Sequence, residues 1–151
     1  MASSAPARVL IVAHRTAATP TLIEAVRRRA AEGTCSFTLL VPASAHGFHR
    51  AADPEGRGAD EAEAMIEMAV PVLEEASGQP VDGRVGDHEP LAAVEDAVNR
   101  EQFDEIIVST LPTRVSRWLH VDLPRKVAGL GIPVTTVTAK GMDSRVASQL
   151  S

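Results

Sequence analysis

The stretch RVLIVA at residues 8–13 decides the fold of this chain. It is a nearly continuous apolar block that is rich in β-branched residues. The same pattern recurs in SFTLLV at residues 36–41 and in EIIV at residues 105–108. Strands that are apolar on both sides are typical of parallel sheets covered by helices on both faces. These three segments are therefore predicted to form the centre of such a sheet.

Outward from these strands, two further strands and four helical intervals complete the pattern. A strand is expected at residues 81–85, and another at residues 133–138, where the Thr-rich composition favours a sheet edge. Apolar residues recur at helical spacing in the four intervals between the strands, after Pro20, from Asp60 to Ser77, after Pro90 and from residue 115 to 129. This alternation predicts an α/β domain with right-handed crossovers.

The composition is that of one globular domain. The chain has 151 residues, of which 44% are hydrophobic and 23% are charged. One cysteine excludes a disulfide framework and a four-cysteine zinc site. A net charge of −5 and an aromatic content of 3% argue against nucleic-acid binding. No apolar run is long enough to cross a membrane, and residues 1–8 do not resemble a signal peptide, so a cytoplasmic protein is expected.

Residues 8–139 are predicted to form the domain, between flexible tails at residues 1–7 and 140–151. Residues 42–59 are rich in Ala, Gly and Pro, and they are predicted to form a long loop. His46 and His49 in this loop have the spacing of some metal-ligand pairs. Zinc sites require three or four ligands, so no metal site is predicted there.

Three segments, taken in order, resemble the universal stress protein family over roughly residues 8–139. The first is the opening strand with the short loop and the helix that follow it. The second is VGDHEPLAAV at residues 85–94, in which a strand ends in Gly-Asp and a helix begins. The third starts with FDEIIVST at residues 103–110 and continues through SRWL to the closing strand that begins IPV at residues 132–134.

The resemblance implies a Rossmann-like, adenine nucleotide alpha hydrolase-like fold, with five parallel strands in the order 3-2-1-4-5 in an open sheet and helices on both faces. In this order the connections leave the first and fourth strands in opposite directions, and ligands favour the crevice that opens there. Subunits of the family often pair through the closing strand, so a homodimer through Val134–Thr138 is expected. The candidate residues for the ligand crevice are Ala13, His14, Arg15, Val41, Gly86, Ser109, Thr110, Arg114, Ser116 and Arg117.

Many members of the family bind ATP in this crevice, but this sequence departs from the residues that do so. His14 stands where those members carry an acidic residue, and residues 109–117 contain no glycine. Glycines let backbone N–H groups approach phosphate, and Pro112 removes one such donor. The family's phosphate-proximal Gly-Ser aligns with Val121-Asp122, where a carboxylate that caps the next helix would repel phosphate. We therefore expect no ordinary ATP binding and no other cofactor.

The arginines of this region have two interpretations. Arg114 and Arg117, with Arg15 nearby, would make the mouth of the crevice basic and hold an anion or a differently placed nucleotide. Alternatively, they pair with Asp122 or extend into solvent. Ser109 and His14 are expected at adjacent strand ends, but no third group or nucleophile elbow accompanies them, so catalysis is not expected.

The leading interpretation is a binding or regulatory module that resembles the universal stress proteins and does not bind ATP in the usual way. The alternative is a nucleotide- or anion-binding protein, or an enzyme, that uses the same crevice between the first and fourth strands.

Overall fold

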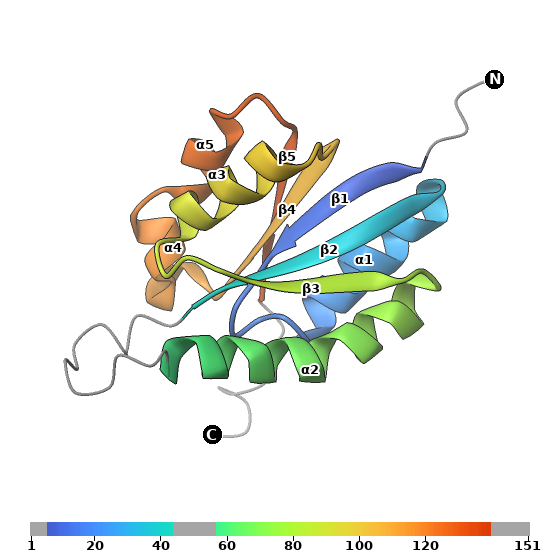
Figure 1. The fold of residues 1–151 in the computed structure, drawn as a ribbon, viewed down its shortest axis with the longest axis horizontal. Coiled ribbons are helices and arrows are strands. Elements are labelled where there is room, and N and C mark those ends of the chain that lie inside the picture. Colours follow the sequence, from blue (N-terminus) through green and yellow to red (C-terminus); the bar gives the residue numbers. More distant parts are fainter. Residues whose placement is uncertain (1–5, 44–56, 140–151) are drawn as a thin grey trace.

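The computed structural model describes residues 6–43 and 57–139, which form an open parallel sheet between two layers of helices (Figure 1). The sheet has five strands in the order β3-β2-β1-β4-β5, as the resemblance implied. The three apolar segments form the central strands β2, β1 and β4, and the Thr-rich segment forms an edge, as predicted. The strands are β1 (Ala7–Val12), β2 (Cys35–Pro42), β3 (Val81–Gly86), β4 (Glu105–Thr110) and β5 (Val134–Thr138).

Helices cover both faces of the sheet. One face carries α1 (Pro20–Glu32) and α2 (Arg57–Ser77), and the other carries α3 (Pro90–Arg100), α4 (Arg117–His120) and α5 (Leu123–Ala128) (Figure 1). A single 3-10 turn, η2 (Thr113–Val115), links β4 to α4. None of the helices in the described residues is both long enough and apolar enough to span a bilayer.

The central strand β1 supplies side chains to two separate apolar layers. Val9 and Ile11 pack under α1 and α2, whereas Leu10 and Val12 pack under α3 and α5. All four side chains are fully buried, because successive side chains of a strand point to opposite faces and both faces are covered. This burial on both faces is the physical reason why the sequence of β1 is continuously apolar from Val9 to Val12.

Two clusters of ion pairs tie the helices to the amino end of the sheet. Arg29 of α1 donates two hydrogen bonds to Glu105, the first residue of β4, at 2.9 Å from Nε and 2.7 Å from Nη2. The hydrogen bond to Glu105 raises the pKa of Arg29 above its usual value. Glu101, which follows α3, pairs with both Arg8 and Arg84.

The single cysteine lies in the core beside the first of these clusters. Cys35 is 1% exposed, and burial raises the pKa of its thiol above the usual range. A thiol that stays protonated at neutral pH is a poor nucleophile, so Cys35 is a packing residue.

Several predicted boundaries were wrong by a few residues. β1 begins at Ala7, one residue before the predicted start of the domain, and β2 includes Pro42; residues 1–5 of the predicted N-terminal tail lie outside the described residues. α2 begins at Arg57 and not at Asp60, although Gly58 disfavours a helix, and Asp60 lies in its first turn where a negative charge favours the helix dipole. The remainder of the predicted loop at 42–59, with its two histidines, and the tail at 140–151 fall almost entirely outside the described residues.

Gly86 ends β3 where this strand meets the first turns of α3. A methyl group at this position would lie 2.7 Å from the Ala93 Cβ and 2.9 Å from the Leu40 Cδ1. The Ala93 methyl has no other rotamer to adopt. We therefore expect Gly86→Ala to lower the free energy of unfolding, measured in urea, by about 1–3 kcal/mol, the usual cost of overpacking.

A double variant provides the control for this contact. Gly86→Ala combined with Ala93→Gly should lose less free energy of unfolding than the sum of the two single variants, because the second change removes the clash. Strictly additive effects would contradict the proposed role of Gly86.

Candidate functional site

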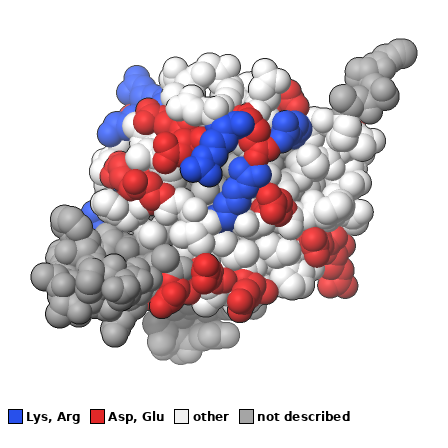
Figure 2. Space-filling view, viewed as in Figure 1, with Lys and Arg blue, Asp and Glu red and all other residues white. Residues whose placement is uncertain are grey.

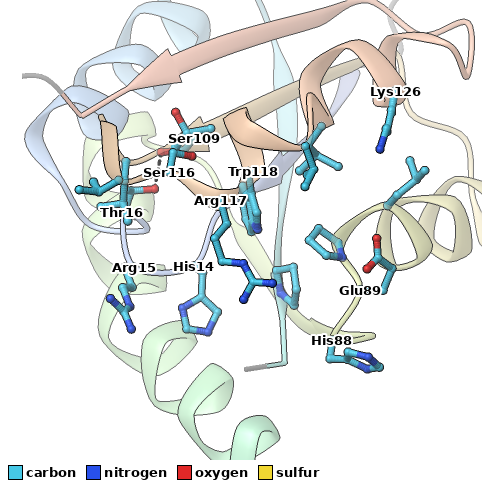
Figure 3. A pocket seen from close by; sticks show the side chains of 18 of the residues that line it. His14, Arg15, Thr16, His88, Glu89, Ser109, Ser116, Arg117, Trp118 and Lys126 are labelled. Atoms are coloured by element: carbon cyan, nitrogen blue, oxygen red, sulfur yellow. Dashed lines mark hydrogen bonds between the residues drawn. The ribbon is translucent and has the colours of Figure 1, made fainter. Parts of the chain in front are cut away.

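A cavity of about 560 Å³ opens at the carboxyl ends of β1 and β4. This is the point where the connections leave neighbouring strands in opposite directions, and the volume is in the usual range for small-molecule sites. The described residues that line it come from the loops after β1 and β2, the start of α3, the end of β4 and the segment from η2 to α5 (Figure 3). They are His14, Arg15, Thr16, Pro42, Ala43, His88, Glu89, Pro90, Leu91, Ser109, Thr110, Leu111, Val115, Ser116, Arg117, Trp118, Val121, Leu123 and Lys126.

A buried pair of hydroxyl groups joins the two strand ends at the cavity. The Oγ1 of Thr16 and the Oγ of Ser109 lie 2.6 Å apart, and both residues are 2% exposed. The loop that carries Thr16 is closed by Thr19, whose hydroxyl and backbone N–H both donate to the Thr16 carbonyl. Thr16 was not among the predicted site residues, because only the fold places this loop against the end of β4.

This pair also bears on catalysis. A serine nucleophile needs a general base within hydrogen-bond distance. The Ser109 hydroxyl instead shares its hydrogen bond with another neutral hydroxyl, that of Thr16. A hydroxyl partner does not activate serine for attack.

Three basic side chains lie on one side of the cavity. His14, Arg15 and Arg117 lie together there, and Lys126 and Glu89 lie across from them (Figure 3). None of the ion pairs formed among residues 6–43 and 57–139 involves Arg15 or Arg117. Glu89 is the one carboxylate among the described lining residues.

Two backbone amides of the segment after β4 are bonded within that segment. The Val115 N–H donates to the Pro112 carbonyl at 2.9 Å, and the Leu119 N–H donates to the Ser116 hydroxyl at 3.1 Å. Amides that are bonded in this way are not available to a phosphate, which is normally held by unpaired N–H groups.

Asp122 stands at the N-cap position of α5, as the sequence predicted, but its carboxylate does not cap the helix. It precedes α5 as its N-cap, but its backbone is left-handed (φ 60°, ψ 41°) and its side chain accepts no hydrogen bond from the helix. N-cap side chains reach the helix amides from an extended backbone, and this geometry differs. The carboxylate pairs instead with Arg125 at 3.4 Å, so the alternative pairing of Arg114 or Arg117 with Asp122 is not formed, and both arginines are exposed.

An apolar wall faces the cavity on the side of α3 to α5. Leu91, Trp118, Val121 and Leu123 line it. Trp118 is half-buried, and it packs on the apolar layer under α3 and α5. Val121, which is 51% exposed, stands where the resemblance placed the first residue of a phosphate-binding Gly-Ser pair.

The structure brings some of the predicted site residues to the cavity and keeps others away. His14, Arg15, Ser109, Thr110, Ser116 and Arg117 line it. Ala13 and Val41 do not, because their side chains join the layer under α1 and α2. Gly86 is a packing residue, and its carbonyl accepts a hydrogen bond from the Ala43 N–H at 2.9 Å. Arg114 is exposed on η2 and lies outside the lining.

Trp118, Glu89 and Lys126 line the cavity, but none was a predicted site residue. Glu89 lies three residues after Gly86, in the segment between β3 and α3 that the resemblance identified, so its position in the sequence could have indicated a role. Trp118 and Lys126 could not be placed from the sequence, because the orientation of α4 and α5 decides which of their side chains meet the cavity.

No protein-family model and no curated protein matches the chain. Solved structures do match it. A universal stress protein in complex with cAMP superposes with a TM-score of 0.61 at 17% identity, covering 89% of this chain and 98% of that one. A family protein from Arabidopsis thaliana with AMP bound gives 0.62 at 14% identity, covering 91% and 95%.

A third structure, the universal stress protein from Archaeoglobus fulgidus in complex with dAMP, gives a TM-score of 0.56 at 14% identity and covers 88% of this chain and 98% of that one. Identities this low establish a shared architecture and leave the ligand to be argued from the site itself. The match extends over nearly the whole length of each neighbour. This chain therefore has the fold of the universal stress proteins.

Proposed function

We propose that this protein is a binding module that holds a small organic anion in the cavity between β1 and β4. The observation that carries the proposal is the pair of guanidinium groups, Arg15 and Arg117, which line the cavity outside every ion pair among the described residues. Guanidinium groups bind carboxylates and phosphates through paired hydrogen bonds. Ligand binding, and not catalysis, is the role that the site supports.

The proposal includes the way in which the anion is held. A glycine-rich loop binds phosphate through backbone N–H groups, but the segment after β4 contains Pro112, which has no N–H, and its Val115 and Leu119 amides are bonded internally. Side-chain cations must then supply the attraction. Such a site favours one compact anionic group over an extended triphosphate with its metal ion.

The structural neighbours suggest the first ligands to test. Three of them are described as complexes with cAMP, AMP or dAMP. Each of these molecules carries a single phosphate group. AMP is therefore a suitable probe for the proposed site, and ATP with magnesium is its natural comparison.

Nucleic acid and membranes are not proposed as partners. Acidic and basic side chains are interspersed on the face that carries α3 and β3, and this face has no continuous basic surface (Figure 2). Charge patterns of this kind do not attract a polyanionic backbone. A cytoplasmic location and a regulatory role in stress stay predictions from the sequence.

Replacing Arg117 tests the proposed anion site directly. Arg117→Gln should weaken AMP binding about tenfold in calorimetry, since hydrogen bonds to charged groups contribute about 1.5–3 kcal/mol when buried and less when exposed. Arg114→Gln is the matched control, because it removes the same charge from the same segment outside the cavity lining. Equal losses for the two variants, or no binding of AMP to the parent protein, would refute the proposal.

The comparison of AMP with ATP tests how the anion is held. ATP with magnesium should raise the midpoint of thermal unfolding by no more than AMP does at the same concentration. A ligand present at 100 times its Kd stabilises a protein by about 2.7 kcal/mol, so a difference in affinity is easily detected. A clearly larger increase in the unfolding midpoint with ATP would indicate that the cavity binds a triphosphate.

We further propose a homodimer through β5, as the sequence predicted. β5 is an edge strand, and its Thr135 and Thr136 are exposed. The Ile106 N–H donates to the Pro133 carbonyl and the Ala139 N–H donates to the Thr110 carbonyl. The backbone N–H and C=O groups that point toward β4 are therefore those of residues 133, 135, 137 and 139. The backbone groups of the alternate residues point away from β4 and can pair with the edge strand of a second subunit.

Thr136→Pro tests this dimer. The substitution removes an outward N–H and leaves the hydrogen bonds to β4 in place, because proline is tolerated at the open side of an edge strand. Light scattering should give twice the 16.0 kDa chain mass for the parent and for the Thr136→Val control, and a monomer for the proline variant. A dimeric proline variant would exclude β5 from the interface.

A further inference from the structure

The cavity has two chemically different halves. His14, Arg15 and Arg117 form the basic half (Figure 3). Leu91, Trp118, Val121 and Leu123 form the apolar half. A purely inorganic anion would use the first half and leave the second exposed to water. The two halves together fit a ligand that carries both a charge and an apolar body.

Exposed apolar side chains are concentrated at the cavity. The large hydrophobic residues that are exposed in the described part of the chain are Met68, Val85, Val115 and Val121. Two of these, Val115 and Val121, line the cavity and are 60% and 51% exposed. Exposed apolar surface that is gathered beside a pocket is typical of a binding site.

The short helix α4 positions one residue of each half of the cavity. Arg117 and Trp118 are consecutive residues at the start of α4, and the Ser116 hydroxyl caps this helix by accepting the Leu119 N–H. The guanidinium and the indole thus reach the same cavity from adjacent backbone positions. A ligand whose charge lies at Arg117 has its body within reach of the Trp118 ring.

We propose that the ligand is an aromatic anion, bound with its anionic group at Arg15 and Arg117 and its ring against Trp118. The inference rests on the proposed function and adds the chemical class and the orientation of the ligand. Aromatic rings pack on an indole with a preference beyond the apolar area that they bury. Glu89 and Lys126, beside the apolar wall, offer an acceptor and a donor to polar substituents of the ring.

This orientation keeps the anionic group away from residues 121 and 122. Val121 presents an apolar side chain there, and Asp122 adds a negative charge that Arg125 partly neutralises. The segment that would hold phosphate in the resembling family is thus on the apolar side in this chain.

Calorimetry with matched probes tests the chemical class. AMP should bind at least fivefold more tightly than ribose 5-phosphate, which keeps the phosphate and lacks the ring. 2-Naphthoate should likewise bind at least fivefold more tightly than acetate. A gain with AMP alone would restrict the class to nucleotides, and a gain with both would extend it to aromatic anions in general. If neither ring improves binding, the inference is wrong.

Trp118→Leu tests the orientation, since it keeps an apolar side chain and removes the indole. It should weaken AMP binding about five- to tenfold, in line with the contribution of an aromatic pair. The affinity for ribose 5-phosphate should change less than twofold. Equal losses for both probes, or no loss for AMP, would contradict the inference.

Fluorescence of the parent protein gives an independent measurement that requires no variant. Trp118 is the one tryptophan of the chain, and the chain contains no tyrosine, so emission excited at the red edge of the indole band reports on this cavity alone. AMP should change the emission, and ribose 5-phosphate should leave it unchanged. Two outcomes separate the aromatic class from the anion site. If ribose 5-phosphate binds as tightly as AMP, if its binding depends on Arg117, and if AMP leaves the emission unchanged, the aromatic class is refuted and the anion site is retained. If none of these probes binds, the proposed function itself is refuted.

Discussion

The connections of this sheet leave β1 and β4 in opposite directions, and this constraint determines where the site is. α1 leads from β1 to β2 on one face, whereas α4 and α5 lead from β4 to β5 on the other (Figure 1). No helix can then cover the carboxyl ends of both central strands. The two strand ends are joined instead by the side-chain hydrogen bond between Thr16 and Ser109, and the cavity opens beside it.

The two ends of the sheet differ in how their charges are arranged. Toward the amino end, Glu105 binds Arg29, and Glu101 binds Arg8 and Arg84, so the charges there are paired. At the carboxyl end, Arg15 and Arg117 take part in none of the ion pairs among the described residues. Paired charges hold helices to strands, whereas cations that remain solvated at the mouth of a cavity are available to a ligand. The paired charges and the proposed binding site thus lie at opposite ends of one sheet.

The chain keeps an architecture while it changes the chemistry of the loops. The sheet matches universal stress protein structures over nearly their whole length at identities below 20%, and no family model matches the sequence. Buried strands tolerate exchange among apolar residues, whereas a binding loop depends on particular groups. Pro112, the Ser116 cap and Val121 each remove a feature that a backbone phosphate site would need. Arg117 and Trp118 line the cavity in the same place, and the proposed side-chain site depends on them.

The sequence by itself determined the strands, their central or edge position and their parallel direction, because residues 9–13, which are buried between two layers of helices, are all apolar. It also identified Arg15, Ser109 and Arg117 as cavity residues, since loops that follow parallel strands meet at one end. Only the tertiary structure decided that Ala13 and Val41 turn into the core, that Thr16 is the partner of Ser109, and that Trp118 lines the same cavity as Arg15 and Arg117. Side-chain direction in a loop or a short helix depends on how that element packs, and local sequence carries no periodic signal for it.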